Sequence, residues 1–258
     1  MPSNVSLSLE GKVALITGGS RGIGAACVRL FTGAGAKGVF NYLHAAAEAE
    51  KLVAACGAAV CHAVQADLTG TATAEPLVRA AVERFGSLDV LVANHAIWPS
   101  DDTPINRMSD EQWRNTVAVN LDSVFALVKH VVAQMKRQQR GGHIVMVSST
   151  AGQRGEAGHA DYAATKGALI SMTKGLSTEL APFGIRVNCV APGWIGTDMS
   201  SDALDDPQRC QTIHNTIPLG RVGTPEEIAG PILFLCTPHA GFITGEIFNV
   251  NGGAVLVG

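Results

Sequence analysis

The sequence lacks the features that mark membrane, nucleic-acid-binding or secreted proteins. No apolar run approaches the length needed to span a bilayer. The net charge is −3, whereas nucleic-acid partners usually require a basic surface. The first residues, MPSNVSLSLEGK, have no charged start followed by the apolar core of a secretory signal peptide. We therefore expect a cytoplasmic protein that binds neither nucleic acid nor a membrane.

Cysteine and histidine are few and scattered. The six cysteines include no CxxC pair, which in a chain of 258 residues indicates small buried side chains of a reducing compartment rather than a disulfide framework. The eight histidines are dispersed, so we predict no catalytic metal. No linker rich in Pro, Ser or charge interrupts the chain, and no internal repeat is visible. Residues 1–258 are expected to form a single domain.

What the sequence does have is a regular alternation of short apolar runs and long amphipathic stretches. Runs that are almost wholly apolar are typical of parallel strands covered on both faces. Repeated strand–helix–strand order predicts an α/β fold, a doubly wound parallel sheet of about seven strands with helices on both faces. The predicted strands span 12–17, 37–42, 58–64, 88–93, 142–149, 184–192 and 246–252, and the predicted helices span 22–35, 45–56, 74–86, 109–138, 160–181 and 225–236.

Several element boundaries are marked by specific residues. Ser109 with Gln112 three residues later predicts a capping box at a helix start. Thr224 before Pro225 predicts an N-cap followed by proline at the first helical position. The least regular stretch, 194–224, is long and polar and follows a strand, which predicts a lid over a binding site.

The loop after the first predicted strand reads TGGSRGIG, residues 17–24. Gly18, Gly22 and Gly24 allow a tight turn and a close approach to a pyrophosphate, and the next helix would offer free N–H groups and the positive end of its dipole. A glycine-rich turn alone is a weak signal. Its place between the first strand and a helix favours dinucleotide binding, with Ser20, Arg21 and Ile23 in the same site.

The end of the second predicted strand bears on which dinucleotide binds. In NAD-binding proteins an acidic residue there usually holds the ribose 2′-hydroxyl. Here the strand ends in Asn41-Tyr42-Leu43-His44, and no acid follows until Glu48. Arg21 and His44 would attract a 2′-phosphate, so we predict NADP(H) as the preferred cofactor and NAD(H) as the alternative. Both side chains could also be ordinary solvated surface groups.

Residues 161–166 read DYAATK, which places Tyr162 and Lys166 four residues apart. Side chains at i and i+4 lie on one helical face. An ammonium beside a phenol favours the phenolate and lowers the pKa of the phenol from about 10. Tyr162 is therefore a candidate for proton transfer. The alternative is a buried core tyrosine next to a surface lysine.

Together these motifs resemble the short-chain dehydrogenase/reductase family, of the type that contains the 3-oxoacyl-carrier-protein reductases. The resemblance runs from GKVALITG to ITGEIFNVNGG and rests on the glycine loop, NHA, VNL, a serine thirteen residues before the tyrosine, YAATK and APGWIGT, in that order. It implies a Rossmann-type fold and an NAD(P)-dependent oxidoreductase. It also implies a homotetramer or homodimer, whose contact surfaces would be the predicted helices 109–138 and 160–181 and the C-terminal GGAVLVG.

The resemblance implies catalytic roles for four residues. Ser149 matches the catalytic serine, because the spacing to Tyr162 selects it over Ser148. Asn120 matches the asparagine that holds a water in the proton relay, and Lys166 would also hold the nicotinamide ribose. The alternative for Asn120 is an asparagine that only hydrogen-bonds backbone.

Further cofactor contacts follow from the same resemblance. Asn94 matches an asparagine that steadies the central sheet, although His95 replaces the small residue that usually follows it. The remaining implied contacts are Asp67, Leu68, Pro192, Gly193, Ile195 and Thr197.

The predicted reaction is the reduction of a carbonyl to a secondary alcohol. Hydride transfer builds negative charge on the carbonyl oxygen, which Tyr162 would protonate and Ser149 would hold by a hydrogen bond. The predicted pocket walls are Ile97, Trp98, Gln153, Arg154, His159, Trp194 and Met199, although the tryptophans could simply cover loops.

The identity of the substrate stays open at this point. Reduction of a 3-oxoacyl thioester is the close alternative, since Arg140 matches a basic residue presented to the acidic carrier, whereas Phe183 replaces a second. Oxidation of a sugar or alcohol with NAD uses the same groups in reverse. A non-catalytic dinucleotide sensor is the alternative of a different class, but such a protein would be expected to lose part of the Ser149, Tyr162 and Lys166 set.

Overall fold

The computed structural model describes residues 7–256 as seven parallel strands in one sheet, in the order β3-β2-β1-β4-β5-β6-β7. Residues 1–6 and 257–258 lie outside the described part. The first range begins the N-terminal segment in which no signal peptide is expected, and the second ends the C-terminal GGAVLVG. The strands are β1 (Val13–Ile16), β2 (Lys37–Tyr42), β3 (Cys61–Gln65), β4 (Val90–Ala93), β5 (Gly142–Val147), β6 (Ile185–Pro192) and β7 (Ile247–Val250). The predicted α/β fold is confirmed.

The strand order determines where a ligand can bind. The chain runs outward from β1 to β3, returns to the centre at β4, and runs outward again to β7. The connections leaving the C-terminal ends of β1 and β4 therefore diverge to opposite sides. In doubly wound sheets this point of reversal is where the ligand crevice forms.

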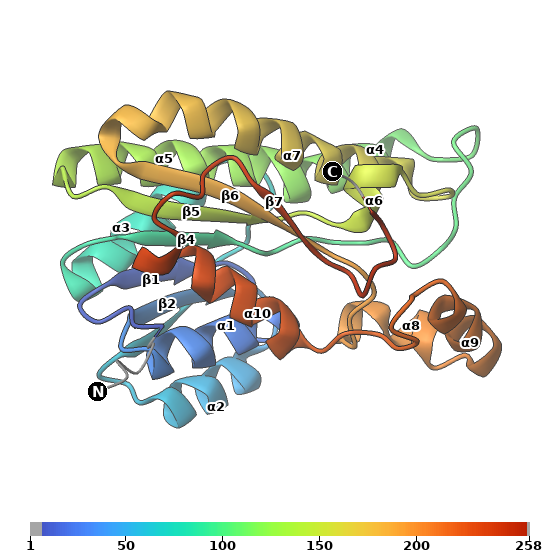
Figure 1. Ribbon diagram of the computed structural model, residues 1–258, viewed down its shortest axis with the longest axis horizontal. Coiled ribbons are helices and arrows are strands. Elements are labelled where there is room, and N and C mark those ends of the chain that lie inside the picture. Colours follow the sequence, from blue (N-terminus) through green and yellow to red (C-terminus); the bar gives the residue numbers. More distant parts are fainter. Residues whose placement is uncertain (1–6, 257–258) are drawn as a thin grey trace.

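Helices cover both faces of the sheet (Figure 1). One face carries α1 (Gly22–Gly33), α2 (Ala46–Cys56) and α10 (Pro225–Leu235), and the other carries α3 (Ala74–Phe85), α4 (Asp110–Val117), α5 (Ser123–Gln138) and α7 (Ala160–Leu180). Alternate strand side chains point to opposite faces. Ile16 and Val92 accordingly pack in the core beneath α1 and α10, whereas Leu15 and Leu91 pack beneath α3 and α5. Two buried faces explain why the strands are apolar almost throughout.

The helices differ from the prediction in three places. A π-helical turn, η1 (Ala118–Asp122), separates α4 from α5 inside the predicted helix 109–138. The short helix α6 (Thr150–Arg154) was not predicted. The 194–224 segment, expected to be irregular, contains α8 (Ser201–Leu204) and α9 (Pro207–Asn215), which lie beyond the C-terminal ends of the strands (Figure 1). Helices of four or five residues are too short to show an apolar period.

The two predicted helix starts have different outcomes. Thr224 and Glu227 form a complete capping box at the start of α10. At α4, Ser109 accepts a hydrogen bond from the backbone N–H of Gln112 at 3.1 Å. The Gln112 side chain instead donates to Asp161 of α7 at 3.2 Å, so the second half of the expected box is replaced by a tertiary contact.

Residues Asp110–Gln138 have the length and composition of a membrane-crossing helix, with a mean hydropathy of 1.4 over an 18-residue stretch. No membrane-spanning run was predicted from the sequence, because polar residues interrupt this stretch. In the described structure this segment packs against α3 and α7, and Leu127 and Val131 are fully buried. This segment is therefore explained as a core helix that covers one face of the sheet.

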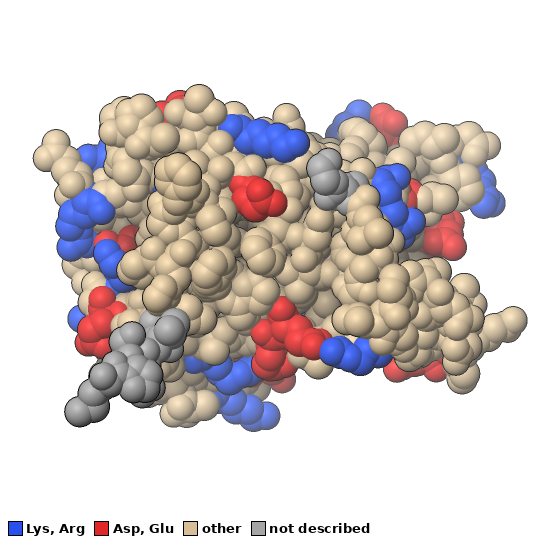
Figure 2. Space-filling model, viewed as in Figure 1, with Lys and Arg blue, Asp and Glu red and all other residues tan. Residues whose placement is uncertain are grey.

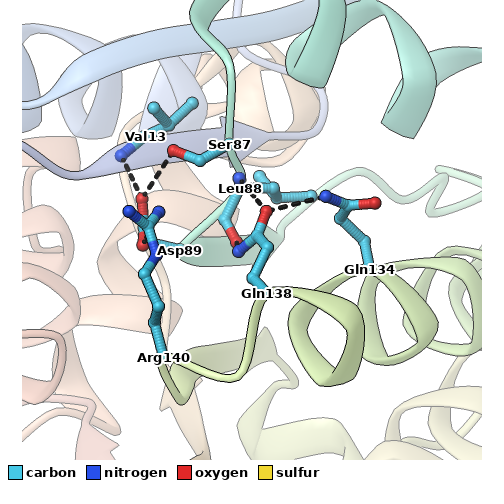
Figure 3. Close-up of polar contacts among 7 residues, drawn as sticks. All are labelled: Val13, Ser87, Leu88, Asp89, Gln134, Gln138 and Arg140. Carbon is cyan, nitrogen blue, oxygen red and sulfur yellow. Dashed lines mark hydrogen bonds and ion pairs between the residues drawn. The ribbon is translucent and has the colours of Figure 1, made fainter.

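A buried carboxylate ties the N-terminal edge of the sheet together (Figure 3). Asp89 accepts hydrogen bonds from the Val13 N–H at 2.9 Å and the Ser87 hydroxyl at 3.2 Å, and its other oxygen lies 2.9 Å from Arg140. The Gln138 side chain bonds both backbone groups of Leu88, at 2.9 and 2.8 Å. These contacts hold the starts of β1 and β4 to the end of α5.

The position of Arg140 differs from the role suggested for it. Under the 3-oxoacyl thioester alternative its charge would face an acidic carrier protein, but it forms an ion pair with Asp89. Arg140 precedes β5 and Ser149 follows it, so the two residues lie at opposite ends of that strand. Within this chain, Arg140 secures the edge of the sheet away from the predicted site.

Candidate active site

A cavity of about 600 Å³ opens at the C-terminal ends of the strands, between the loops after β1 and β4 and the segment that follows β6. Most of the predicted site residues line it. They are Gly18, Ser20, Arg21, Gly22, Ile23, Tyr42, His44, Asp67, Leu68, Asn94, Ile97, Trp98, Ser149, Arg154, Tyr162, Lys166, Pro192, Gly193, Trp194, Ile195, Thr197 and Met199. Four predicted residues do not line it, namely Gly24, Asn120, Gln153 and His159.

The glycine loop forms one wall, and its glycines serve two purposes. Gly18 and Gly22 have φ values of 62° and 51°, which other residues adopt at a cost. Gly24 is needed for space, because a Cβ there would lie 2.1 Å from the Gly18 carbonyl oxygen. The loop therefore folds directly onto the first turn of α1. The resulting concave wall of backbone at a helix N-terminus suits a pyrophosphate.

Two asparagines anchor this loop. Asn94 donates from its side chain to the Thr17 carbonyl at 2.9 Å, which joins the ends of β1 and β4. Asn41 accepts from the Gly18 N–H at 2.8 Å and donates to Ala66 at 3.0 Å. Asn41 was not among the predicted site residues. It could have been identified as a candidate because it is a polar residue inside an otherwise apolar strand.

The residues expected to select the dinucleotide lie at the same end of the cavity. Tyr42 and His44 line it after β2, and no carboxylate from that strand end does. Arg21 lines it too, with its guanidinium 3.0 Å from Asp198. Both side chains of that pair are more than half exposed, at 61% and 69%. Exposed pairs of this kind contribute only about 0–1 kcal/mol, so this one does not fix Arg21 in place.

Ser149 and Tyr162 lie next to each other because α6 packs tightly on α7. A Cβ on Gly152 of α6 would lie 2.6 Å from the Lys166 backbone, so only glycine permits this crossing. Ser149 caps α6, accepting from the Ala151 N–H at 3.1 Å, and its side chain is hydrogen-bonded with Tyr162. The neighbouring Ser148 instead donates to the Lys166 carbonyl at 2.8 Å.

The electrostatics of Tyr162 differ from the expectation. Burial, the largest effect, raises the pKa of Tyr162 to about 12, although the hydrogen bond with Ser149 opposes this rise. Lys166 is itself buried, which lowers the pKa of its ammonium to about 8, and its Nζ donates to the Val147 carbonyl at 2.8 Å. The predicted lowering of the phenol's pKa by Lys166 is therefore not seen in this chain, since desolvation of the phenolate outweighs it. At neutral pH Tyr162 holds its proton.

Asn120 is fully buried behind the cavity wall. Its side-chain oxygen accepts from the Ile97 N–H at 2.8 Å, and its amide donates to the Ile97 carbonyl at 2.9 Å and to Thr165 at 3.4 Å. The side chain thus fixes the loop that follows β4 against α7. Asn120 also lies in the π-helical turn η1, a distortion often found at functional sites.

His95, which replaces a small residue of the family pattern, lies in a closed hydrogen-bond chain. Its Nε2 is 2.6 Å from Ser123 Oγ, and that hydroxyl donates to Val119, so Nε2 carries the proton. Its Nδ1 is 2.7 Å from Thr17 Oγ1 and accepts from it. Burial, with a smaller effect of Lys166, lowers the pKa of His95 to about 3. A neutral ring therefore links β1 to α5 directly beneath the cavity.

Aromatic side chains form the remaining wall, at the substrate end. Trp98 and Trp194 meet edge to face with ring centroids 6.0 Å apart, and His159 packs behind Trp98 at 4.8 Å. Met199 completes this wall at the start of the predicted lid. Gln153, predicted to contact substrate, instead donates to Asn249 at 2.6 Å.

Glu156 was missed by the sequence analysis although it lines the cavity. It is half-buried, and burial raises the pKa of its carboxyl. The Trp98 side chain hydrogen-bonds to it, and its charge raises the pKa of Tyr162, so it lies close to both. The residue sits in a glycine-rich loop, where no periodic pattern distinguishes a wall residue from a solvated one.

These features together are the arrangement of a dinucleotide-dependent oxidoreductase, with a backbone cradle for phosphates and a Ser–Tyr–Lys set in one cavity. A family model described as enoyl-(acyl carrier protein) reductase matches residues 18–255. A 3-oxoacyl-(acyl-carrier-protein) reductase of Synechocystis sp. is 40% identical over 254 residues, covering 96% of this chain and 99% of that protein.

Solved structures give the same result. A short-chain dehydrogenase/reductase from Brucella melitensis, described as a glucose/ribitol dehydrogenase, has a TM-score of 0.90 at 38% identity and covers 98% of this chain and 100% of its own. A 3-ketoacyl-(acyl-carrier-protein) reductase from Brucella melitensis complexed with NADH has a TM-score of 0.88 at 33% identity, with coverage of 96% and 100%. The chain belongs to the short-chain dehydrogenase/reductase family and is an NAD(P)-dependent oxidoreductase.

Proposed function

We propose that the protein uses NADPH to reduce a ketone or related carbonyl on a small or medium-sized substrate to a secondary alcohol. The observation that supports this most directly is the Ser149–Tyr162 hydrogen bond in a cavity that also contains Lys166 and the glycine loop. A proton donor and a site for a hydride donor thus share one enclosure. A dinucleotide sensor would have no need of this combination.

The residues of the cavity fit a nicotinamide dinucleotide. A Cβ at Gly24 would lie 2.1 Å from the Gly18 carbonyl oxygen, so the glycine loop and the first turn of α1 approach closely and present bare backbone to a pyrophosphate. Lys166 lines the cavity and would hold the nicotinamide ribose, and Asp67 and Leu68 line the end where an adenine would lie. When bound, the reduced nicotinamide supplies a hydride to the carbonyl carbon.

The chain's own groups would handle the oxygen and its proton. Ser149 would donate a hydrogen bond to the carbonyl oxygen and fix its direction. Tyr162, protonated at neutral pH, would transfer its proton to the same oxygen as negative charge develops there. Lys166, with a pKa of about 8, is suited to return a proton to the phenol.

The proposed preference for NADPH rests on the charges near the second strand. No acid follows β2 within the cavity to repel a 2′-phosphate, and Arg21 and His44 lie beside that end. Asp198 lies next to Arg21 and weakens the positive field, but the pair is exposed and free to open. We also propose that residues 194–224 act as the lid, since the start of this segment, from Trp194 to Ser200, lines the cavity and α8 and α9 follow it beyond the C-terminal ends of the strands (Figure 1).

The test is the reduction of a simple activated ketone, followed as the loss of NADPH absorbance. Tyr162→Phe removes only the phenolic hydroxyl and should lower kcat by at least about 100-fold, the usual contribution of a general acid. Cofactor affinity, measured by fluorescence titration, should change little. Ser171→Ala removes a hydroxyl from an exposed position further along α7, outside the cavity, and should retain turnover. Equal turnover by Tyr162→Phe and wild type would rule out the mechanism.

Reduction of a 3-oxoacyl thioester remains the second candidate, favoured by the similarity to 3-oxoacyl-(acyl-carrier-protein) reductases. Against it, Arg140 is engaged by Asp89, and Phe183 stands where a second basic residue was expected, with Lys136 stacked on its ring at 3.8 Å. Acidic and basic side chains are interspersed on the face shown in Figure 2, with no broad basic area there to receive an acidic carrier. The six cysteines are all free, which suits the proposed cytoplasmic location.

A further inference from the structure

The substrate end of the cavity contains a carboxylate with too few partners. Glu156 is half-buried in the wall, and the polar side chain that hydrogen-bonds to its carboxylate is Trp98. His159 and Arg154 act on it only through their charges, and no ion pair to it occurs among the described residues. A carboxylate can accept about four hydrogen bonds. Because Glu156 lines the cavity, the accepting capacity that Trp98 does not use is available to a ligand there.

The loop that carries Glu156 is fixed, so its side chain does not simply swing into solvent. The Thr103 N–H donates to the Gly158 carbonyl at 2.9 Å, and His159 lies 3.0 Å from Asp102. Gly158 has a φ of 80°, and a Cβ there would lie 3.2 Å from the Asp102 backbone. The loop after α6 is thereby clamped to the loop after β4. Groups held in this way are preorganised for binding.

The position of Glu156 relative to the reacting groups is equally informative. Its charge raises the pKa of Tyr162, so the carboxylate lies near the phenol that would meet the substrate oxygen. Trp98, which contacts it, forms an edge-to-face pair with Trp194 in the same cavity. A substrate held by Tyr162 and Ser149 would therefore place its neighbouring carbons between a carboxylate and two aromatic surfaces.

We propose that Glu156 accepts hydrogen bonds from hydroxyl groups of the substrate, which makes that substrate a polyhydroxylated carbonyl compound or alcohol of the sugar type. This inference rests on the proposed function and specifies its substrate class. Hydroxyl groups would satisfy the carboxylate, and the C–H faces between them would pack on Trp98 and Trp194. A fatty acyl chain would bury the same carboxylate without a donor, which is costly.

Arg154 does not change this assignment. It lines the cavity at the end of α6 but is exposed, whereas Glu156 is half-buried. An exposed guanidinium at the rim is well solvated and adds little to binding. A substrate selected mainly for negative charge would be repelled by Glu156 at close range.

The experiment compares two classes of substrate in wild type, Glu156→Gln and Glu156→Leu. The first class is a set of polyols and aldoses oxidised with NADP⁺ or NAD⁺, and the second is a plain cyclic ketone and a short 3-oxoacyl thioester reduced with NADPH. In Glu156→Leu, kcat/KM for the best hydroxylated substrate should fall about 10- to 100-fold, as for a buried hydrogen bond to a charged group. Its value for the plain ketone should stay within about twofold or rise. Glu156→Gln, which keeps the shape, should fall between wild type and Glu156→Leu.

Three outcomes separate the two proposals. Equal loss on both substrate classes in Glu156→Leu, or no loss on either, would overturn the role of Glu156. Wild type that reduces the plain ketone or the thioester but turns over no hydroxylated compound would overturn the substrate class and leave the proposed function intact. No turnover with any compound, in wild type that still binds NADPH, would overturn the proposed function and this inference with it. Glu111→Gln, a change on the outer side of α4, is the matched control and should behave as wild type.

Discussion

Two buried side chains, Tyr162 and Lys166, carry most of the chemistry, and burial sets the charge state of both. It raises the pKa of Tyr162 to about 12 and lowers that of Lys166 to about 8. The phenol is therefore a proton donor at neutral pH, which suits reduction. The reverse reaction requires a phenolate, because the alcohol must lose its proton to a base.

The two reaction directions should accordingly depend on pH in opposite ways. The kcat/KM for alcohol oxidation is expected to rise by up to about tenfold per pH unit over about pH 7 to pH 10, as the phenolate becomes accessible. The kcat/KM for carbonyl reduction should fall above about pH 8, where Lys166 loses the proton that it would return to the phenol. Glu156→Gln should shift the rise to lower pH, since its charge raises the pKa of Tyr162. Initial rates in both directions across this range are the measurement. An oxidation rate that peaks at or below neutral pH would contradict the assignment.

The buried environment of His95 leads to a separate prediction about how the free energy of unfolding depends on pH. Its pKa is lowered to about 3 in the folded chain, so below its ordinary pKa of about 6.5 the unfolded chain binds a proton that the folded chain does not. The free energy of unfolding should fall as pH decreases through this window, by up to about 1.4 kcal/mol per pH unit from this residue. His95→Ala removes that contribution, so its urea-unfolding free energy should depend less on pH between about pH 6 and pH 4.

The comparison concerns the slope, because His95→Ala also creates a cavity that lowers stability at every pH. His44→Ala, an exposed histidine, is the control and should keep the wild-type slope. An unchanged slope in His95→Ala would show that the histidine is not held neutral.

Among the helices, the crossing of α6 over α7 is the contact that assembles the catalytic groups. Gly152 lies so close to the Lys166 backbone that a methyl group cannot be inserted without moving one helix. Gly152→Ala should therefore separate Ser149 from Tyr162 and lower kcat by at least about tenfold, as expected when reacting groups are misplaced. Gly175→Ala, further along α7, is the matched control.

Nothing lies within 4 Å of a Cβ at Gly175, and this helical position does not require glycine. That variant should keep full activity and gain about 0.5–1 kcal/mol in the free energy of unfolding. Steady-state kinetics measure the activity of the two variants, and denaturant melts measure their free energies of unfolding. Full activity in Gly152→Ala would show that the helix crossing does not position Ser149.

The strands and long helices could be predicted from the sequence because burial on two faces leaves a long, regular apolar signature. The site residues on the glycine loop and around Tyr162 could be found because they form motifs with fixed spacing. What could not be predicted depends on tertiary contacts. The π-helical turn at Asn120 and the one-sided cap at Ser109 arise where α4 and η1 meet α7. Glu156 and Asn41 carry no motif, and only their place around the cavity assigns them.

The surface of the molecule indicates how copies of it would associate. Trp113 on α4 is 41% exposed and Phe125 on α5 is 53% exposed, on the segment that the family resemblance implies as a contact surface. We expect a homotetramer or homodimer whose subunit interface buries these side chains. Light scattering should give a mass two or four times the 26.8 kDa chain, and Phe125→Glu should shift it toward the monomer. A wild-type protein that is monomeric at assay concentrations would contradict this expectation.

The protein is proposed to transfer a hydride from NADPH to a carbonyl carbon while Tyr162 protonates the oxygen. This transfer can be followed with NADPH that carries deuterium in place of its transferable hydrogen, with a simple activated ketone as acceptor. Deuterium should appear on the carbinol carbon of the product, one atom per NADPH consumed, and Tyr162→Phe should form almost none. NADPH loss without deuterium in the alcohol, or equal labelling by Tyr162→Phe, would rule out the proposed transfer.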